Sequence, residues 1–232
     1  MNTIKLAVFD MAGTTVNEHN IVYKTVQKVI NDLGYKVSLD QVLKYGAGKE
    51  KHQAIIDVLQ NCTRSKAIKQ EAQTAFAAFK PALETAYDTQ EIGTFKGILP
   101  FFKKLKTHDI KVVLNTGYDA KTATKILTKL DWKTGREIDL MVTADDVENG
   151  RPNPDMIYKA MREFNITNAK AVLKAGDSEI DIIEGKNAGC GLTVGVLSGA
   201  QNRQQLEAAR PNYMLDVITD LEELLFGENL FH

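Results

Sequence analysis

The 232-residue sequence has few cysteines, prolines and tryptophans, and it lacks long apolar runs. Its two cysteines, Cys62 and Cys190, stand far apart and outside any CxxC pattern, which excludes a disulfide framework and a cysteine zinc site. Lysine and arginine total 29 against 30 acidic residues, so no excess of positive charge favours a nucleic-acid partner. The first apolar stretch ends at Asp10 and is too short for a signal peptide or a membrane span. We therefore expect a cytoplasmic protein with no nucleic-acid or membrane partner.

The chain does contain enough apolar residues, 44%, for a sizeable core. Residues 4–9 form a short apolar run with β-branched members, which predicts a strand buried on both faces. Residues 17–88 show only helical spacing, and Pro81 is expected to kink or split the last, alanine-rich helix of this block. After Gly97 the two patterns alternate, with strands predicted at 110–114, 140–143, 171–174 and 192–197.

Strands that alternate with helices build parallel sheets through βαβ connections. The sequence therefore predicts an α/β fold, a Rossmann-like parallel sheet with helices on both faces, formed by residues 1–16 and 91–232. Residues 17–90 would form an all-helical domain inserted after the first strand, with a cleft between the two domains. The apolar face of the first inserted helix is also a candidate surface for a homodimer.

Acidic residues follow two of the predicted strands. Asp10 directly follows the first strand, and Asp177 and Asp181 come after strand 171–174. Because parallel strands bring their carboxyl ends to one edge of a sheet, we expect these carboxylates to gather there. Three carboxylates without a nearby cysteine or histidine favour a hard cation, with Mg²⁺ as the expected one. Each aspartate could instead serve only as a helix cap.

Four segments, in this order, resemble the motifs of the haloacid dehalogenase superfamily: residues 10–16 (DMAGTTV), 115–118 (NTGY), 150–152 (GRP) and 176–181 (GDSEID). The resemblance covers essentially the whole chain and implies the superfamily's α/β core, with the helical insertion as its cap domain. It implies that Asp10 is a nucleophile that forms an aspartyl-phosphate. Thr116 would bind phosphoryl oxygens, and Arg151 would offset the charge on the nucleophile and the phosphoryl group.

The resemblance also implies a Mg²⁺ cofactor and a small phosphorylated or phosphonate substrate. Asp10, the backbone carbonyl of Ala12 and Asp177 would hold the ion, and Asp181 would act through water or by orientation. Ala12 stands where most phosphatases of the superfamily carry a second aspartate, which protonates the leaving oxygen. Alanine cannot transfer a proton, so an acid for a leaving oxygen would have to come from the cap or from the substrate.

The Asp-x-Ala-Gly-Thr-Thr variant resembles the phosphonoacetaldehyde hydrolase family, the phosphonatases. There a cap lysine forms an imine with the substrate aldehyde, and the carbon leaves phosphorus as an enamine, so no acid is needed beside Asp10. Residues 45–52 (YGAGKEKH) are similar to that family's lysine loop, with Lys49 at the lysine position. The same resemblance implies further substrate-binding residues, namely Gly46, His52, Gly117 and Tyr118 together with Ala12.

Imine formation needs a neutral amine, whereas a free lysine has a pKa of about 10.4. Desolvation or the neighbouring Lys51 could lower the pKa of Lys49. On a helix beginning near Lys49, this residue and His52 would share one face. Lys49 could instead be a solvated lysine at a helix start.

The sequence thus predicts a Mg²⁺-dependent, phosphonatase-like hydrolase. Tyr45 replaces a methionine of the phosphonatases, which keeps a phosphatase of a small phosphate monoester as an alternative. A non-catalytic phosphate-binding regulatory module is a second alternative. Two nucleotide-binding signals fail, because Glu50 replaces the Ser/Thr of a Walker loop and Val194 replaces the third glycine of a dinucleotide fingerprint.

Overall fold

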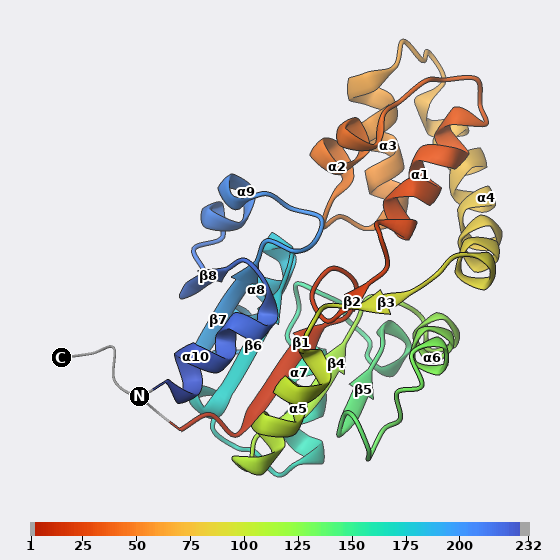
Figure 1. Ribbon diagram of the computed structural model, residues 1–232. Helices are drawn as coiled ribbons and strands as arrows, with labels where there is room; N and C mark the ends of the chain where they lie inside the picture. Colours follow the sequence, from red (N-terminus) through yellow and green to blue (C-terminus); the bar gives the residue numbers. More distant parts are fainter. Residues whose placement is uncertain (1–2, 228–232) are drawn as a thin grey trace. The chain divides into compact units, whose positions relative to one another are not determined.

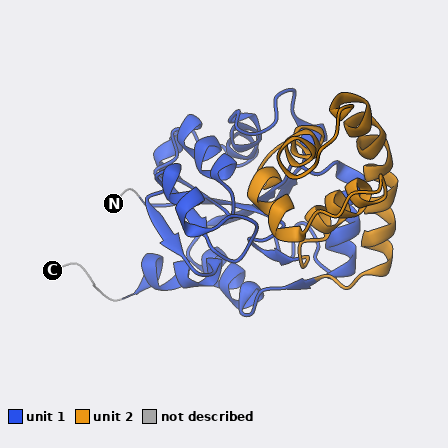
Figure 2. Cartoon of the chain, turned by 90° about the horizontal axis from the view of Figure 1, so that it is seen from above, with its two compact units in different colours: residues 1–17, 93–232 blue, residues 18–92 orange. Residues whose placement is uncertain are grey.

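The computed structural model describes residues 3–227 of the chain. It divides into two compact units, Met1–Asn17 with Gly93–His232 and Glu18–Ile92 (Figure 2). The second unit is therefore an insertion in the first.

A six-stranded sheet forms the centre of the first unit, in the order β5-β4-β1-β6-β7-β8 (Figure 1). All five neighbouring pairs run parallel. The strand order reverses between β1 and β6, which is where open α/β sheets bind their ligands. The strands are β1 (Leu6–Asp10), β4 (Lys111–Asn115), β5 (Leu140–Val142), β6 (Val172–Gly176), β7 (Leu192–Val196) and β8 (Tyr213–Leu215).

Helices cover both faces of this sheet. Successive side chains of β1 point to opposite faces, so their contacts show what packs on each side. The Phe9 ring lies 6.0 Å from the Phe101 ring and 5.7 Å from the Phe102 ring of α5. On the other side, Leu6 and Val8 belong to a core cluster with α7. The predicted fold class, a parallel sheet with helices on both faces, is confirmed. The helices of this unit are α5 (Ile98–Thr107), α6 (Ala120–Lys129), α7 (Asp155–Glu163), α8 (Glu179–Asn187), α9 (Arg203–Ala208) and α10 (Leu221–Phe226).

A two-stranded antiparallel ribbon, β2 (Val16–Asn17) and β3 (Gly93–Thr94), joins the two chain segments that flank the insertion. Sequence analysis missed this ribbon, because two residues are too few to show the alternation of a strand. The first long strand also runs to Asp10 instead of ending before it.

Four helices make up the second unit: α1 (Ile21–Asn31), α2 (Leu39–Gly46), α3 (Lys51–Cys62) and α4 (Ile68–Thr89). The apolar face of α1, which includes Val22 and Val26, is buried, and α1 packs against α4. That face was a candidate dimer surface, but the unit's own helices already cover it. Among residues 3–227, no helix is both long enough and apolar enough to cross a bilayer.

Pro81 lies inside α4, which continues as one helix from Ile68 to Thr89. Of the two expected effects of Pro81, a kink or a split, the split does not occur. Proline removes one helical hydrogen bond, the one to the carbonyl of Ala77 four residues earlier. Both residues are exposed, so water can replace the lost donor.

Candidate active site

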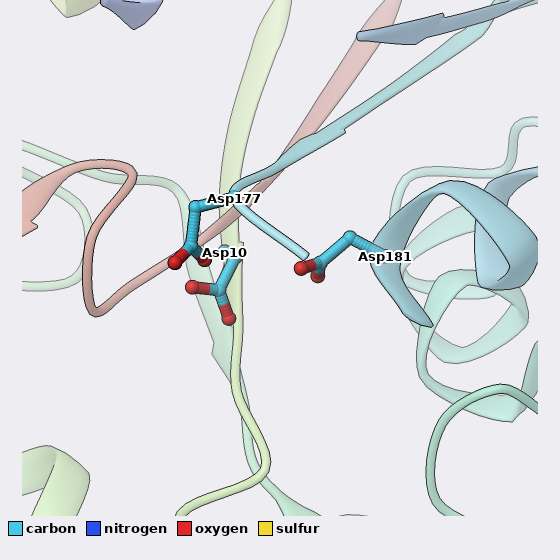
Figure 3. Close-up of side chains that lie close together, drawn as sticks. All are labelled: Asp10, Asp177 and Asp181. Carbon is cyan, nitrogen blue, oxygen red and sulfur yellow. The ribbon is translucent and has the colours of Figure 1, made fainter. Parts of the chain in front are cut away.

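Three aspartates meet at the carboxyl edge of the parallel sheet. Asp10 is the last residue of β1, Asp177 directly follows β6, and Asp181 lies in the first turn of α8. One carboxylate oxygen of each lies within 4.8 Å of the others, and all three residues are buried. Figure 3 shows the Asp181 carboxylate directed from the start of its helix toward the other two. Carboxylates held this close in a buried site repel one another and attract a cation.

The local sequence explains how these side chains converge. Strands β1 and β6 are paired in register, with Phe9 opposite Ala175, so they end at the same level of the sheet. Ser178 then caps α8, and its hydroxyl donates to Asp181 Oδ2 at 2.6 Å. A Cβ on Gly176 would lie 2.1 Å from Asp181 Cγ, so only glycine fits beside that carboxylate.

Arg151 connects two of the three carboxylates. Its Nη1 donates to Asp10 Oδ1 at 2.9 Å and also to Asp181 Oδ1. Burial alone would lower the pKa of Arg151, but the nearby charges of Asp181 and Asp10 raise it above its ordinary value. The guanidinium therefore stays charged beside Asp10, where it can offset negative charge on a bound anion.

The three aspartates differ in their ionisation. Burial raises the pKa of Asp181, but Lys174 and Arg151 outweigh it and bring the pKa to about 2. Burial, followed by the charges of Asp10 and Asp181, raises the pKa of Asp177 well above its ordinary value. Burial, followed by the charge of Asp181, also raises the pKa of Asp10. Cations of the protein thus keep Asp181 ionised, whereas ionisation of Asp10 and Asp177 is disfavoured until a further cation lies beside them.

The donor set fits a hard divalent cation. Asp10, Asp177 and Asp181 offer carboxylate oxygens, which are preferred ligands of Mg²⁺ and Ca²⁺. The carbonyl oxygen of Ala12 accepts no hydrogen bond from any residue in the described range 3–227, so it is available as a further oxygen ligand. Asp181 already accepts bonds on both oxygens, which favours Asp10 and Asp177 as the direct ligands.

The residues after β4 lie at the same sheet edge. Asn115 pairs with Asp10 in the β1–β4 register, and Thr116 follows it, buried. Thr116 Oγ1 accepts from the backbone N–H of Tyr118 at 3.2 Å. A Cβ on Gly117 would lie 3.5 Å from Arg151 Nη2, so this loop runs beside the guanidinium. Four of the segments singled out from the sequence thus supply neighbouring side chains in the first unit.

The remaining predicted site residues belong to the second unit. Lys49 Nζ forms an ion pair with Asp57, and Asp57 also accepts from Gln53 Nε2 at 2.7 Å. Helix α3 begins at Lys51 with Glu50 as its N-cap, so Lys49 lies outside it. The prediction that Lys49 shares a helix face with His52 is therefore wrong, because a glutamate carboxylate caps the helix after the lysine.

Two other predicted residues of the second unit have local packing contacts. The His52 ring lies 5.0 Å from the Phe76 ring. A Cβ on Gly46 would lie 3.1 Å from the Ala54 Cβ, so Gly46 permits close packing of α2 against α3. Lys51 Nζ donates to the Lys49 carbonyl at 2.7 Å, and the nearest charged partner of the Lys49 amine is Asp57, an anion.

Sequence analysis missed three buried polar residues next to the site: Asn115 at the end of β4, Lys174 inside β6 and Glu184 on α8. A sequence signal for one of them existed, since Lys174 interrupts an otherwise apolar strand that is buried throughout. A glutamate within a helix and an asparagine at a strand end carry no such signal, because these residue types are mostly exposed.

The chain is similar to hydrolases along most of its length. The family model described as haloacid dehalogenase-like hydrolase matches residues 7–195. A phosphonoacetaldehyde hydrolase of Latilactobacillus sakei subsp. sakei (strain 23K) is 33% identical over 217 residues, covering 86% of this chain and 78% of that protein. Pyrophosphatase PpaX of Bacillus cereus (strain B4264) is 26% identical over 229 residues, covering 97% of this chain and 98% of that protein.

The fold is also that of a solved relative. The crystal structure of a phosphonoacetaldehyde hydrolase like protein from Oleispira antarctica superposes with a TM-score of 0.78 at 23% identity. The match covers 97% of this chain and 92% of that one. Together, the four ordered motifs, the parallel sheet with its buried aspartates and the matching family model show that this chain is an enzyme of the haloacid dehalogenase-like hydrolase family.

Proposed function

We propose that this hydrolase transfers a phosphoryl group to Asp10 and then to water, with phosphonoacetaldehyde or a related phosphonate as substrate. The single observation that carries the phosphoryl-transfer step is the arrangement of Asp10, which ends β1, contacts Arg151 and lies within 4.8 Å of Asp177 and Asp181. A carboxylate nucleophile beside a permanent cation suits attack on an anionic phosphorus centre.

In the phosphoryl-transfer step, an oxygen of Asp10 forms a bond to phosphorus, and the bond from phosphorus to the departing carbon breaks. Arg151 would offset the charge on the phosphoryl oxygens, while Thr116 and Gly117 would bind them from the loop after β4. Mg²⁺, held by Asp10, Asp177 and the carbonyl of Ala12, would supply charge neutralisation and alignment of the substrate. Water then hydrolyses the aspartyl-phosphate and releases phosphate.

The phosphonate substrate is inferred from Ala12. The proton donor that a phosphate ester needs for its leaving oxygen is absent at this position. If the Lys49 amine condenses with the substrate aldehyde, water leaves and an iminium forms. The electron pair of the breaking carbon–phosphorus bond then moves into the iminium and produces an enamine, so no acid is required beside Asp10. Protonation of the enamine carbon by water and hydrolysis of the resulting iminium would release acetaldehyde and regenerate the Lys49 amine. His52, Tyr118 and Gly46 are the proposed substrate-binding residues of this route.

The ion pair between Lys49 and Asp57 bears on this route. Imine formation uses a free amine, so the route requires the Lys49 amine to leave its ion pair with Asp57 and lose a proton before it attacks the aldehyde.

A phosphatase of small phosphate compounds is the second candidate, favoured by the similarity to pyrophosphatase PpaX. In that case Lys49 would bind the substrate only by charge. Membership in a hydrolase family argues against the second alternative, a non-catalytic regulatory module.

Phosphate release from phosphonoacetaldehyde, pyrophosphate and a panel of phosphate monoesters tests the proposal. We expect the phosphonate to be preferred, Asp10→Asn to lower its turnover at least about 10³-fold, and EDTA to abolish it. Wild-type turnover in Asp10→Asn would contradict the role of the nucleophile.

Borohydride reduction in the presence of phosphonoacetaldehyde tests the imine. The wild type should gain a reduced adduct at Lys49, and the charge-preserving control Lys49→Arg should gain none. A wild type without an adduct, but with phosphate release from monoesters, would favour the phosphatase instead.

A further inference from the structure

Lys174 is a fully buried lysine within a strand. It lies in β6, where all five residues are buried, and its own exposure is 0%. Its Nζ donates to Asp181 Oδ1 at 2.8 Å, to Asn115 Oδ1 at 2.8 Å and to the Ala175 carbonyl at 3.3 Å. An ammonium ion so far from water is tolerated only with such partners, so this position has a specific requirement for a charged donor.

Asn115 and Glu184 close this arrangement into a network. Asn115 Nδ2 donates to both carboxylate oxygens of Glu184, at 2.9 and 3.0 Å, and Lys174 Nζ lies 3.5 Å from Glu184 Oε2. All three residues have 0% exposure. These residues belong to β4, β6 and α8, so the network connects the two strands that end at the site with the helix that begins there.

Asp181 connects the network to the nucleophile. Its Oδ1 accepts from both Lys174 and Arg151, and its Oδ2 accepts from Ser178. Arg151 in turn donates to Asp10 Oδ1. The position of Arg151 beside Asp10 therefore depends on where Lys174 holds the Asp181 carboxylate.

We propose that Lys174, supported by Asn115 and Glu184, is a positioning residue that fixes Asp181 and thereby orients Arg151 toward Asp10. The inference rests on the proposed function of Asp10 as the nucleophile. Lys174 has no contact with that carboxylate among its hydrogen bonds, so it acts through Asp181 and Arg151.

The charges around Lys174 predict how removal of its ammonium group would change cation binding and turnover. Four buried carboxylates, those of Asp10, Asp177, Asp181 and Glu184, exceed by two the charges of Arg151 and Lys174. Without the lysine charge, a divalent cation should bind no less tightly, because the site becomes more negative. Turnover should fall, because a displaced guanidinium no longer meets the reacting group in the required geometry.

The test compares Lys174→Met with the double variant Lys174→Met/Glu184→Gln. In the single variant we expect the turnover number to fall about 10- to 100-fold, with a substrate KM within about threefold of wild type. Its thermal midpoint in EDTA should also fall, because Glu184 loses its buried counter-ion. Calorimetric titration of the metal-free protein with Mg²⁺ should show binding at least as tight as that of wild type.

The double variant separates positioning from stability. Removing Glu184's charge relieves the unpaired carboxylate, so the thermal midpoint should recover, while turnover stays low because Asp181 still lacks its donor. Recovery of turnover together with stability would overturn the proposal, as would Mg²⁺ binding lost in parallel with activity. Lys111→Met, an exposed lysine on neighbouring β4, is the matched control and should behave as wild type. Absence of phosphate release from the wild type would instead defeat the proposed function.

Discussion

At the scale of single residues, the site gives one side-chain type three different tasks. Asp181 is held ionised, with a pKa of about 2, by Lys174 and Arg151 once their attraction outweighs burial. Asp177 accepts a hydrogen bond from the Ala200 N–H at 2.6 Å, and burial raises its pKa strongly. Asp10 has a single cationic hydrogen-bond partner among these groups, Arg151. Position in the network, not residue type, thus determines how readily each carboxylate ionises.

Gly13 supports the site through its backbone. Its φ of 83° is left-handed, and a Cβ there would lie 2.6 Å from Asp177 Oδ2 and 2.8 Å from the Gly199 Cα. We expect Gly13→Ala to cost about 1–3 kcal/mol of unfolding free energy and to lower phosphate release at least about 10-fold. Urea unfolding and steady-state kinetics would measure the two effects.

Gly135→Ala is the matched control for this prediction. Gly135 has a similar φ of 86° but no atom within 4 Å of the added Cβ. It should lose stability from the left-handed backbone alone and keep its activity. Equal activity in the two variants would show that the space beside Asp177 is not critical.

At the scale of elements, one turn of α8 carries both Asp181, which lies at the site, and Glu184, which belongs to the buried network. Ser178 caps the helix, Asp181 faces the site, and Glu184, three residues later on the same side, meets Lys174 and Asn115. The helix packs against β6 and β7. A rigid helix thus carries both the anchoring carboxylate and its buried support.

Helix α4 is where the sequence is locally least favourable for its structure. Replacing Pro81 by alanine restores an N–H donor for the Ala77 carbonyl, so we expect about 1–3 kcal/mol of added unfolding free energy without a change in turnover. Chemical denaturation followed by circular dichroism would measure it. Ala78→Gly, an exposed neighbour, should destabilise by about 1 kcal/mol. A less stable Pro81→Ala protein would mean that the ring makes packing contacts that outweigh the lost hydrogen bond.

At the scale of the whole molecule, removal of divalent cations should make stability depend on pH. Because the pKa of Asp177 is raised on folding, its stabilising effect is full below the unfolded value of about 3.9 and is lost as the pH rises through the folded pKa. Asp181 acts in the opposite sense, since its pKa of about 2 gives stability that is lost only as the pH falls toward that value.

We therefore expect the thermal midpoint in EDTA to decline as the pH is raised from about 4.5, a range in which Asp181 is already ionised. Asp177→Asn, which cannot ionise, should flatten this decline, and Mg²⁺ should stabilise the wild type most at the alkaline end. Scanning calorimetry of both proteins across this pH range would measure the decline in thermal midpoint. A wild type and an Asp177→Asn variant with the same slope would remove Asp177 as the source.

Much of the fold could be predicted from local pattern. The alternation of apolar strands with amphipathic helices indicated the parallel sheet, and the helix-only spacing of residues 17–88 indicated the helical insertion. The gathering of Asp10 and Asp177 could also be predicted, because the parallel strands that precede them end at a common edge of the sheet. The β2–β3 ribbon and the continuation of α4 through Pro81 were not readable, since both depend on contacts and solvent exposure and not on periodicity.

The amino-acid sequence by itself determined the order of strands and helices, the positions of the acidic residues at strand ends and the absence of an acid at Ala12, because these follow from residue type and spacing. Only the tertiary structure decided that Lys174 is buried, that Asn115 and Glu184 enclose it, and that Asp57 is the partner of Lys49. The physical reason is that an ion pair depends on distance and exclusion of water, and residues that are far apart in sequence acquire both only when the chain folds.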